Sequence, residues 1–457
     1  MPLNLTPLLQ RFADRAPLPV MARALLEHQF SATRLDSWFE QVADHQYTRE
    51  LLFSTTFDLM SQVVFRQHDS VRAAYQRAVE PIGVSLSAVY EKLKGIEPGT
   101  TAALVSDSAA RSVALIEQLG GQRQALLPGV VVKVLDGNCL AGTEHRLVET
   151  RSAGEAPLPG KSLAVLDPGL GVISQLVPCE DAYTQERVLV DDVLPTVKAG
   201  ELWLADRNFC TLKIVFGIAQ PGGWSLIREH QQVPFKTLSE LGKRVRIDGG
   251  WVREQRIEVN YQGQTLKLRR LRVDLDEPTR DGDYHLHLWC TLPRKLASAA
   301  QLAELYRKRW TIETAFLKLT VELRCEINTL GYPRAALFGF AVAVVAYNIL
   351  AVIWAVLRVV HGEQTVDNDI SSYHVADEMA NMAESLTLIV DGEDWAVFRQ
   401  LSVAVMARWL LACAANIQLR KYQKAKPRGP KKSPPKRTKG ASPHVSTARL
   451  IAQRTSQ

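Results

Sequence analysis

Cysteine is scarce and scattered in this 457-residue chain. The six cysteines form no Cys-x-x-Cys pair and no cluster with histidine, which argues against a zinc site and a disulfide framework. The N-terminus lacks a basic start followed by a sustained apolar stretch, so we expect no secretory signal and a reducing, cytoplasmic location. With 46% hydrophobic residues the chain is not disordered as a whole, and its length predicts two or three domains.

Acidic residues are absent from residues 420–457, which carry twelve lysines or arginines. The formal charge of +7 therefore belongs to this end, and residues 1–419 carry −5. Prolines interrupt the basic run, so residues 419–457 are predicted to form an extended, solvated and flexible tail. Such a tail suits a polyanion such as DNA, and its alternative interpretation is a solubilising segment.

The organisation of the chain changes near residue 125. Residues 1–125 show helical periodicity and predict a helical N-terminal domain. Within it, Ser85 and the apolar residues after it are compatible with the start of a DNA-recognition helix, and equally with an ordinary helix cap. Residues 126–418 predict an α/β domain with strand-like runs at 130–135, 162–166, 172–177 and 202–205.

A β-rich insertion is expected at residues 222–292, because several strand-like segments follow one another there without a helix of convincing length. One helix is then expected over residues 298–330. Residues 335–357 are almost wholly apolar and long enough to span a bilayer. Because Asn348 lies near their centre and Arg358 follows directly, we favour a helix buried inside the protein over a membrane anchor.

Two strand-like runs end in aspartate, at Asp136 and at Asp206. In an α/β core this places carboxylates where strands emerge side by side, the usual position of a site. Carboxylate oxygens suit Mg²⁺ or Mn²⁺, which can drive phosphodiester chemistry in pairs. Either aspartate alone could simply mark a turn. Asp167, followed by Pro168 and Gly169, is predicted to be such a hairpin turn and is left out of the site.

A third carboxylate comes from the segment Tyr306-Arg-Lys-Arg309-Trp-Thr-Ile-Glu313. At 100° per residue, Tyr306, Arg309 and Glu313 share one face of a helix. By itself this pattern is equally typical of an amphipathic surface helix. Combined with the two upstream aspartates, it predicts a three-carboxylate site.

These three pieces together resemble the DDE transposases of bacterial insertion sequences, in the branch named for its Tyr-x2-Arg-x3-Glu-x6-Lys signature. The resemblance implies a ribonuclease H-like catalytic core, with the β-rich insertion between the second aspartate and the glutamate. It implies that Asp136, Asp206 and Glu313 hold two Mg²⁺ or Mn²⁺ ions. It also implies that Tyr306 and Arg309 contact phosphate of the transposon end.

The resemblance also implies that Arg207, directly after the second aspartate, and Arg228 face DNA, where an arginine can bind phosphate with two donors. The chain departs from the signature at Thr320, where a lysine is expected. Lys318 is the nearest lysine, but on a regular helix it lies about 140° from Glu313 and would have to reach round.

The function that the resemblance implies is cut-and-paste transposition, with DNA cleavage at terminal inverted repeats followed by strand transfer into target DNA. It implies a homodimer on DNA in the bacterial cytoplasm, associated with the nucleoid, and no membrane. The departure at Thr320 keeps open a catalytically impaired DNA-binding relative, and the apolar stretch at 335–357 keeps open a membrane-anchored protein.

Overall fold

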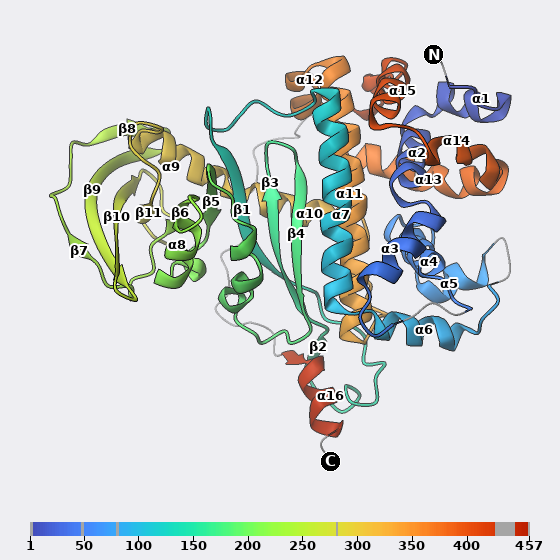
Figure 1. Cartoon of the computed structure of the whole chain (residues 1–457), viewed down its shortest axis with the longest axis horizontal. Helices are drawn as coiled ribbons and strands as arrows, with labels where there is room; N and C mark the ends of the chain where they lie inside the picture. The colour runs from blue at the N-terminus through green and yellow to red at the C-terminus, as the bar shows by residue number, and fades with distance from the viewer. Residues whose placement is uncertain (1–2, 47–49, 79–81, 280–281, 426–443, 456–457) are drawn as a thin grey trace.

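The computed structural model describes residues 3–46, 50–78, 82–279, 282–425 and 444–455 (Figure 1). Two long helices, α7 (Pro98–Leu119) and α11 (Pro333–His361), stand side by side in the middle of the molecule. The sheet lies on one side of this pair, and the helices α1 to α6 and α13 to α15 lie on the other. Pro98 and Pro333 each begin their helix at a position where the missing N–H costs nothing.

The N-terminal region is helical, as expected for residues 1–125. Ser85 begins α6 by accepting a hydrogen bond from the backbone N–H of Ala88 at 3.3 Å, so the predicted helix start is confirmed. A role of this helix in DNA recognition stays a prediction, as does the domain boundary. The six helices before α7 are α1 (Pro7–Arg15), α2 (Pro17–Phe30), α3 (Ala32–Val42), α4 (Phe53–Val64), α5 (Val71–Gln76) and α6 (Leu86–Gly95).

C-terminal helices complete the same helical body. Helices α13, α14 and α15 pack against α2, and α15 also packs against α7. This helical body, formed by α1 to α6 and α13 to α15, is therefore built from segments at both ends of the chain. The helices after α11 are α12 (Glu363–Asp369), α13 (Ser372–Ile389), α14 (Ala396–Arg399) and α15 (Val403–Ala415), with the 3-10 helix η5 (Gly392–Trp395) before α14.

The central sheet is mixed, and its strand order is β4-β3-β1-β5-β6 before it continues into the insertion. Strands β1, β3 and β4 are antiparallel neighbours, whereas β5 and β6 run parallel to β1. This arrangement is consistent with a ribonuclease H-like core. The five strands are β1 (Val131–Cys139), β3 (Lys161–Asp167), β4 (Val172–Cys179), β5 (Glu201–Ala205) and β6 (Trp224–Arg228).

Both faces of the sheet are covered. Val132 and Val134 of β1 belong to the core that includes α7 and α11, whereas Leu135 belongs to a second core on the opposite face. Successive side chains of a strand point to opposite faces, so one apolar strand can serve both cores. The second core is closed by α8 (Leu212–Ala219) and by the 3-10 helices η1 (Glu186–Asp192) and η2 (Leu194–Thr196).

The predicted hairpin turn at Asp167 is confirmed. Asp167 ends β3, and its backbone oxygen accepts from Gly171 N–H at 2.7 Å just before β4 begins. Its carboxylate accepts from Leu170 N–H and pairs with Lys133 at 2.9 Å.

The β-rich segment at 222–292 continues the central sheet instead of forming a separate one. Strand β11 pairs with β6 on one side and with β10 on the other. A strand with two partners joins the segment to the core through one hydrogen-bonded ladder. The strands beyond β6 are β7 (Lys236–Thr237), β8 (Val245–Ile247), β9 (Gly250–Tyr261), β10 (Gln264–Leu275) and β11 (His285–Cys290).

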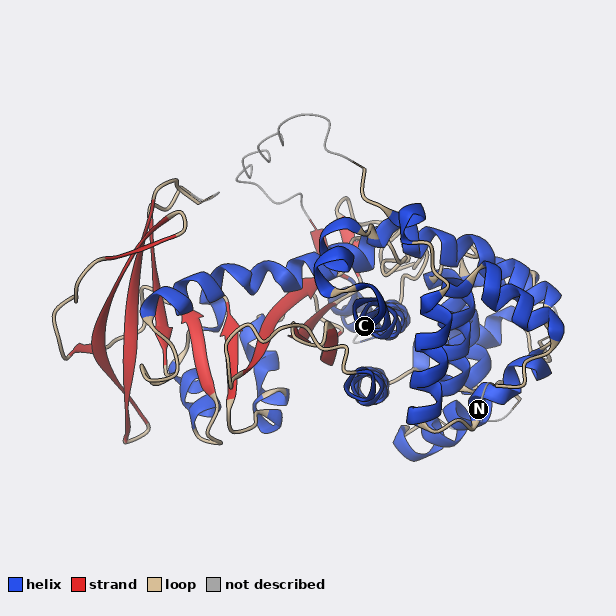
Figure 2. Ribbon diagram, turned by 90° about the horizontal axis from the view of Figure 1, so that it is seen from above, coloured by secondary structure: helices blue, strands red, loops and turns tan. Residues whose placement is uncertain are grey.

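The single helix expected over residues 298–330 is wrong in its continuity and its end. The chain forms α9 (Ala299–Arg307), a 3-10 turn η4 (Lys308–Trp310) and α10 (Thr311–Val321). Helix α9 begins with a capping box between Ser298 and Gln301. Figure 2 shows this broken helix lying along the sheet and leading toward the central helices.

Helix α11 is the one described helix long and apolar enough to cross a membrane, with a mean hydropathy of 2.4 in its most apolar window. In the structure 89% of that window is buried inside the protein. Asn348 lies on this helix with no exposed surface, and its amide bonds to both backbone groups of Ile173 on β4. Packing within the protein accounts for its apolar composition.

The basic C-terminal segment is anchored on both sides of residues 426–443, which lie outside the described residues. Before them, the ammonium of Lys424 donates to the backbone oxygens of Asp367 and Asn368. After them, β12 (His444–Ser446) pairs with β2 (Ala156–Leu158) and leads into α16 (Thr447–Thr455). The segment therefore returns to the core and is not a free tail over its described length. The 3-10 helix η6 (Leu419–Tyr422) precedes Lys424.

Candidate active site

The two aspartates predicted from the strand endings lie next to each other. Strands β1 and β5 are parallel neighbours, with Leu135 opposite Ala205, so Asp136 and Asp206 follow at equivalent positions. Asp206 begins the short 3-10 helix η3 (Arg207–Phe209), and its side chain accepts from the backbone N–H of Arg207. Strand β5 ends directly before Asp206, as the sequence predicts, whereas β1 continues through Asp136 to Cys139, so the strand end predicted at Asp136 is wrong. The two aspartates still lie side by side, because pairing with β3 carries β1 beyond the end of β5.

Arg309 links the third carboxylate to the first. Its Nη1 donates to Oδ2 of Asp136 at 2.8 Å, and its Nη2 donates to Oε1 of Glu313 at 3.2 Å. The Arg309 side chain is 9% exposed, that of Asp136 16% and that of Glu313 54%. A planar guanidinium with paired donors suits two carboxylates at once. The structure therefore gathers Asp136, Glu313 and Arg309 around one point.

Tyr306 positions α9, the helix directly before the 3-10 turn η4 that carries Arg309. Its hydroxyl donates to the backbone oxygen of Ala205 at 3.2 Å, and the side chain is buried. Burial raises the pKa of Tyr306 above its usual value, so the hydroxyl keeps its proton. The bond fixes α9 on the end of β5, directly before Asp206. In this structure the hydroxyl contacts protein and not solvent.

The pKa of Asp136 is raised to about 6, chiefly by burial. The neighbouring carboxylates of Asp206 and Glu186 add to the rise, while Arg309 and the Gly137 N–H oppose it. Burial also raises the pKa of Glu186, with a further contribution from Asp206. Like charges that raise each other's pKa lie close together. The site therefore concentrates negative charge beyond what one arginine balances.

Glu186 is a residue of this site that the sequence patterns did not reveal. It begins η1, and its carboxyl packs against Gly137, where an added Cβ would lie 2.3 Å from Cδ of Glu186. A glycine after Asp136 thus leaves room for a fourth carboxylate. The only sequence signal is that glycine, because Glu186 stands in an irregular segment with no motif around it.

The donor set fits a hard divalent cation in its chemistry, because it consists of carboxylate oxygens. Among the residues that the structure describes, no three His, Cys, Asp or Glu side chains are placed to hold one metal ion. Instead the guanidinium of Arg309 lies between Asp136 and Glu313. A divalent ion shared by these two carboxylates would take the place of a cation that is already there.

The three remaining residues predicted to contact DNA, Arg207, Arg228 and Lys318, lie in different surroundings. Arg207 is exposed beside Asp206. Arg228 ends β6 and pairs with Asp283 at 2.6 Å. Lys318 points away from the carboxylates toward α11, with its ammonium 5.6 Å from the centre of the Trp354 ring, and burial lowers its pKa. Helix α10 is not distorted in a way that would bring Lys318 to the side of Glu313.

Comparison with known proteins gives one family. Residues 134–349 match the family model described as "Transposase DDE domain", a range that contains all three predicted carboxylates. No curated protein matches the chain. A solved structure, the cryo-EM structure of a piggyBac transposase synaptic complex with hairpin DNA, is 11% identical and covers 84% of this chain and 82% of its own, with a TM-score of 0.38. The family match confirms the resemblance at the level of the DDE domain, and the narrower signature branch stays a prediction.

Proposed function

We propose that this protein is a DDE transposase that cuts DNA at the terminal inverted repeats of an insertion sequence and joins the ends to target DNA. The proposal is supported by the neighbouring positions of Asp136 and Asp206 on parallel strands and by Arg309, which bonds to both Asp136 and Glu313, all within the matched DDE segment.

In this proposal Asp136, Asp206 and Glu313 would hold two Mg²⁺ or Mn²⁺ ions. When bound, such ions polarise the phosphodiester and stabilise the charge that develops on the leaving oxygen. The chain's own contribution is to hold the carboxylates together on β1, β5 and α10. Released from the carboxylates, Arg309 would turn its two donors to a phosphate, since carboxylate and phosphate present similar oxygen pairs.

The same proposal includes the partners and the location of the protein. Terminal repeats and target DNA would be the substrates, a homodimer would bridge two DNA ends, and the bacterial cytoplasm would be the location.

The remaining predicted contacts would each have a role. Tyr306 would act by fixing α9 against β5, and Arg207 would contact the DNA backbone beside Asp206. Arg228 would bind phosphate by leaving Asp283. Lys318 would need a different rotamer to contribute.

The test is cleavage of a DNA duplex that carries the repeats flanking the coding region. With Mg²⁺ or Mn²⁺, the parent protein is expected to nick or cut it, and Asp206→Ala is expected to bind it without cutting. A chain that binds the repeats yet never cuts them would be the second candidate, a catalytically impaired DNA-binding relative, which Thr320 favours. Equal cutting by both proteins would remove Asp206 from the mechanism.

A further inference from the structure

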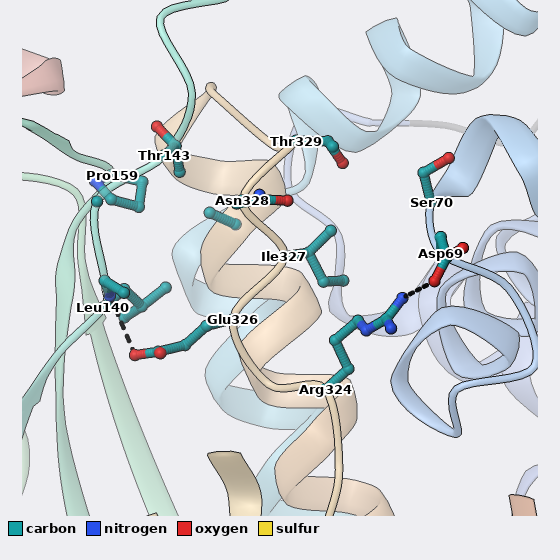
Figure 3. Close-up of a pocket in the computed structure, with 13 residues that line it drawn as sticks. Asp69, Ser70, Leu140, Thr143, Pro159, Arg324, Glu326, Ile327, Asn328 and Thr329 are labelled. Carbon is teal, nitrogen blue, oxygen red and sulfur yellow. Dashed lines mark hydrogen bonds and ion pairs between the residues drawn. The ribbon is translucent and has the colours of Figure 1, made fainter. Parts of the chain in front are cut away.

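The C-terminal end of α10 is held by a segment from the helical body, residues 64–69. We call this contact, between residues 64–69 and 320–326, the α10 junction. The backbone N–H of Arg324 donates to Val64 O at 2.9 Å, and its guanidinium pairs with Asp69 at 2.9 Å. Figure 3 shows this pair beside a cavity of about 570 Å³ that runs on past Glu326. The junction therefore fixes the helical body to the helix that carries Glu313.

Arg66 stands at the centre of this junction. Its Nη2 donates to the backbone oxygen of Thr320 at 3.4 Å and to that of Val321. These are terminal carbonyls of α10, where a positive charge is favourable. Arg66 is exposed, and among the described residues it forms no ion pair. Its positive charge lowers the pKa of Glu322, against the larger rise caused by burial. Donors of its guanidinium remain open to solvent.

The backbone of Arg66 is unusual. Its φ is +60°, in the left-handed region that a side chain with a Cβ rarely adopts. Glycine or asparagine would hold this turn with less strain. Non-glycine residues in this region are found where the surrounding structure requires their side chain in one place, often at functional sites.

Arg66 reaches the last turn of α10, which includes Thr320. Thr320 is seven residues beyond Glu313, which puts it within about 20° of the same direction and roughly 10 Å further along the helix. Its side chain is exposed, and its hydroxyl donates to Phe316 O. The expected lysine is missing from this position, and Arg66 brings a cation to it from another part of the chain.

We propose that Arg66 is the phosphate-binding cation at this end of α10 and takes the place of the lysine absent at Thr320. It positions the DNA backbone that runs from the carboxylates along the helix. The inference rests on the proposed function, because its ligand is a DNA phosphate. Arg324, the other cation of the junction, is neutralised by Asp69 and serves to hold the two parts together.

Binding of the repeat-containing duplex at a series of salt concentrations tests this. One phosphate contact contributes about 0.9 to the slope of log affinity against log salt. Arg66→Ala is expected to lower the slope by about that amount. Thr320→Lys in the Arg66→Ala background is expected to restore it. Arg11→Ala, which removes an exposed arginine of α1, is the matched control and is expected to keep the parent slope.

Thermal unfolding of the same variants separates DNA binding from helix capping. Arg66→Ala is expected to lower the Tm, and Thr320→Lys is expected to restore the salt slope without restoring the Tm. An unchanged slope in Arg66→Ala, or a lost slope that Thr320→Lys does not restore, would overturn the inference. A parent protein that binds no DNA at any salt concentration would instead overturn the proposed function.

Discussion

Arg309 is the residue on which the state of the site depends. Arg309 is buried, and its guanidinium forms ion pairs with both Asp136 and Glu313. Among the described residues, no other cation bonds to both carboxylates. Removing one member of a buried ion pair leaves a charge without compensation, whereas a metal ion would supply that compensation again. In the proposed function, the guanidinium and a divalent ion would therefore compete for the same oxygens.

Arg309→Gln is expected to lower the free energy of unfolding by about 3 kcal/mol in the absence of divalent ions, since Asp136 loses its partner while the exposed Glu313 suffers less. Added Mg²⁺ should then raise the Tm of the variant more than that of the parent, because no guanidinium competes. Thermal unfolding with and without Mg²⁺ measures this. An equal Mg²⁺ effect on both proteins would show that Arg309 does not occupy the ion's place.

Asp136 predicts a pH dependence of stability. Burial raises its pKa to about 6 in the folded protein, above the ordinary value of 3.8, so the folded state holds a proton that the unfolded state releases between these values. Its stabilising contribution is full below pH 4 and is lost as the pH rises to 6, by roughly 2 to 3 kcal/mol.

Asp136→Asn cannot release this proton, so its unfolding free energy is expected to fall less than that of the parent between pH 4 and pH 6. Urea unfolding at a series of pH values gives the difference between the two proteins. Parallel curves would mean that Asp136 is ionised throughout this range.

Part of the site is predictable at the residue scale. The apolar runs before Asp136 and Asp206 predict two strands, but only β5 ends at its aspartate, because pairing with β3 extends β1 to Cys139. Helical periodicity predicts that Arg309 and Glu313 share one face. The bonds of Arg309 to two carboxylates are not predictable, because they depend on the 3-10 turn η4 that interrupts the helix there. Glu186 is not predictable either, because it meets Gly137 through the tertiary fold alone.

At the scale of elements, α11 is tied to the sheet by one polar side chain. The amide of Asn348 accepts from Ile173 N at 2.9 Å and donates to Ile173 O at 3.0 Å and to Ser108 Oγ at 3.2 Å. These bonds join α11 to β4 and α7. A buried amide with all these partners is suited to a core helix, where each bond replaces one to water.

Asn348→Leu is expected to lower the free energy of unfolding by about 2 to 3 kcal/mol, because buried backbone groups of Ile173 lose their partners. Leu350→Met, on the same helix, is the matched control and should cost less than about 1.5 kcal/mol. Urea unfolding measures both. A cost for Asn348→Leu no greater than that of the control would show that these bonds do not anchor α11.

The C-terminal segment is held by Asp181. Its carboxylate accepts from Ser446 Oγ at 2.7 Å and from Arg449 Nε at 2.9 Å. Burial favours the protonated form, but these bonds and the Tyr183 N–H outweigh it and hold the pKa of Asp181 at about 2. This stabilising contribution is present above pH 4 and is lost as the pH falls toward 2.

Asp181→Asn is expected to detach β12 and α16, since the charge that binds Arg449 is gone. Hydrogen exchange of residues 444–455 near neutral pH should become faster. Glu180→Gln, whose glutamate pairs with Arg334 instead, should leave this exchange unchanged. Unaltered protection in Asp181→Asn would assign the anchoring to the β12–β2 pairing.

The elements themselves were predicted unevenly. Strands β1, β3, β4 and β5 lie within a few residues of the expected runs, because each is a short apolar segment with clear turn residues around it. The continuation of the sheet through β11 was missed, since the partner of a strand is not encoded by its own pattern. The end of α10 at Val321 was missed because residues 64–69 supply its cap.

For the whole molecule, the distribution of charge limits how DNA can bind. Residues 1–419 carry a net charge of −5, so overall charge does not attract a polyanion to this part. In the proposed function, affinity there would come from individual arginines, such as Arg207 beside Asp206 and Arg66 at the end of α10. The basic residues of 420–457 would add attraction that weakens with salt.

In the account proposed here, helix α10 would take part in both metal binding and DNA binding. Helix α10 begins beside the sheet, where Glu313 meets Asp136 through Arg309, and ends at the helical body, where Arg66 caps it. A DNA strand lying along α10 would contact the carboxylates and the helical body together. This geometry is not visible in the sequence, since residues 66, 136 and 313 are joined only by the tertiary fold.

The central claim is that the three carboxylates form one metal centre. The most direct test measures the binding of Mn²⁺ to the protein in complex with the repeat-containing duplex, with free Mn²⁺ detected by electron paramagnetic resonance. Asp136→Asn, Asp206→Asn and Glu313→Gln are each expected to weaken binding at least about tenfold, since each removes a charged ligand. Asp191→Asn, at an exposed ion pair with Lys213, should bind as the parent does. If the three variants bind Mn²⁺ as tightly as the parent, these carboxylates do not form one metal centre.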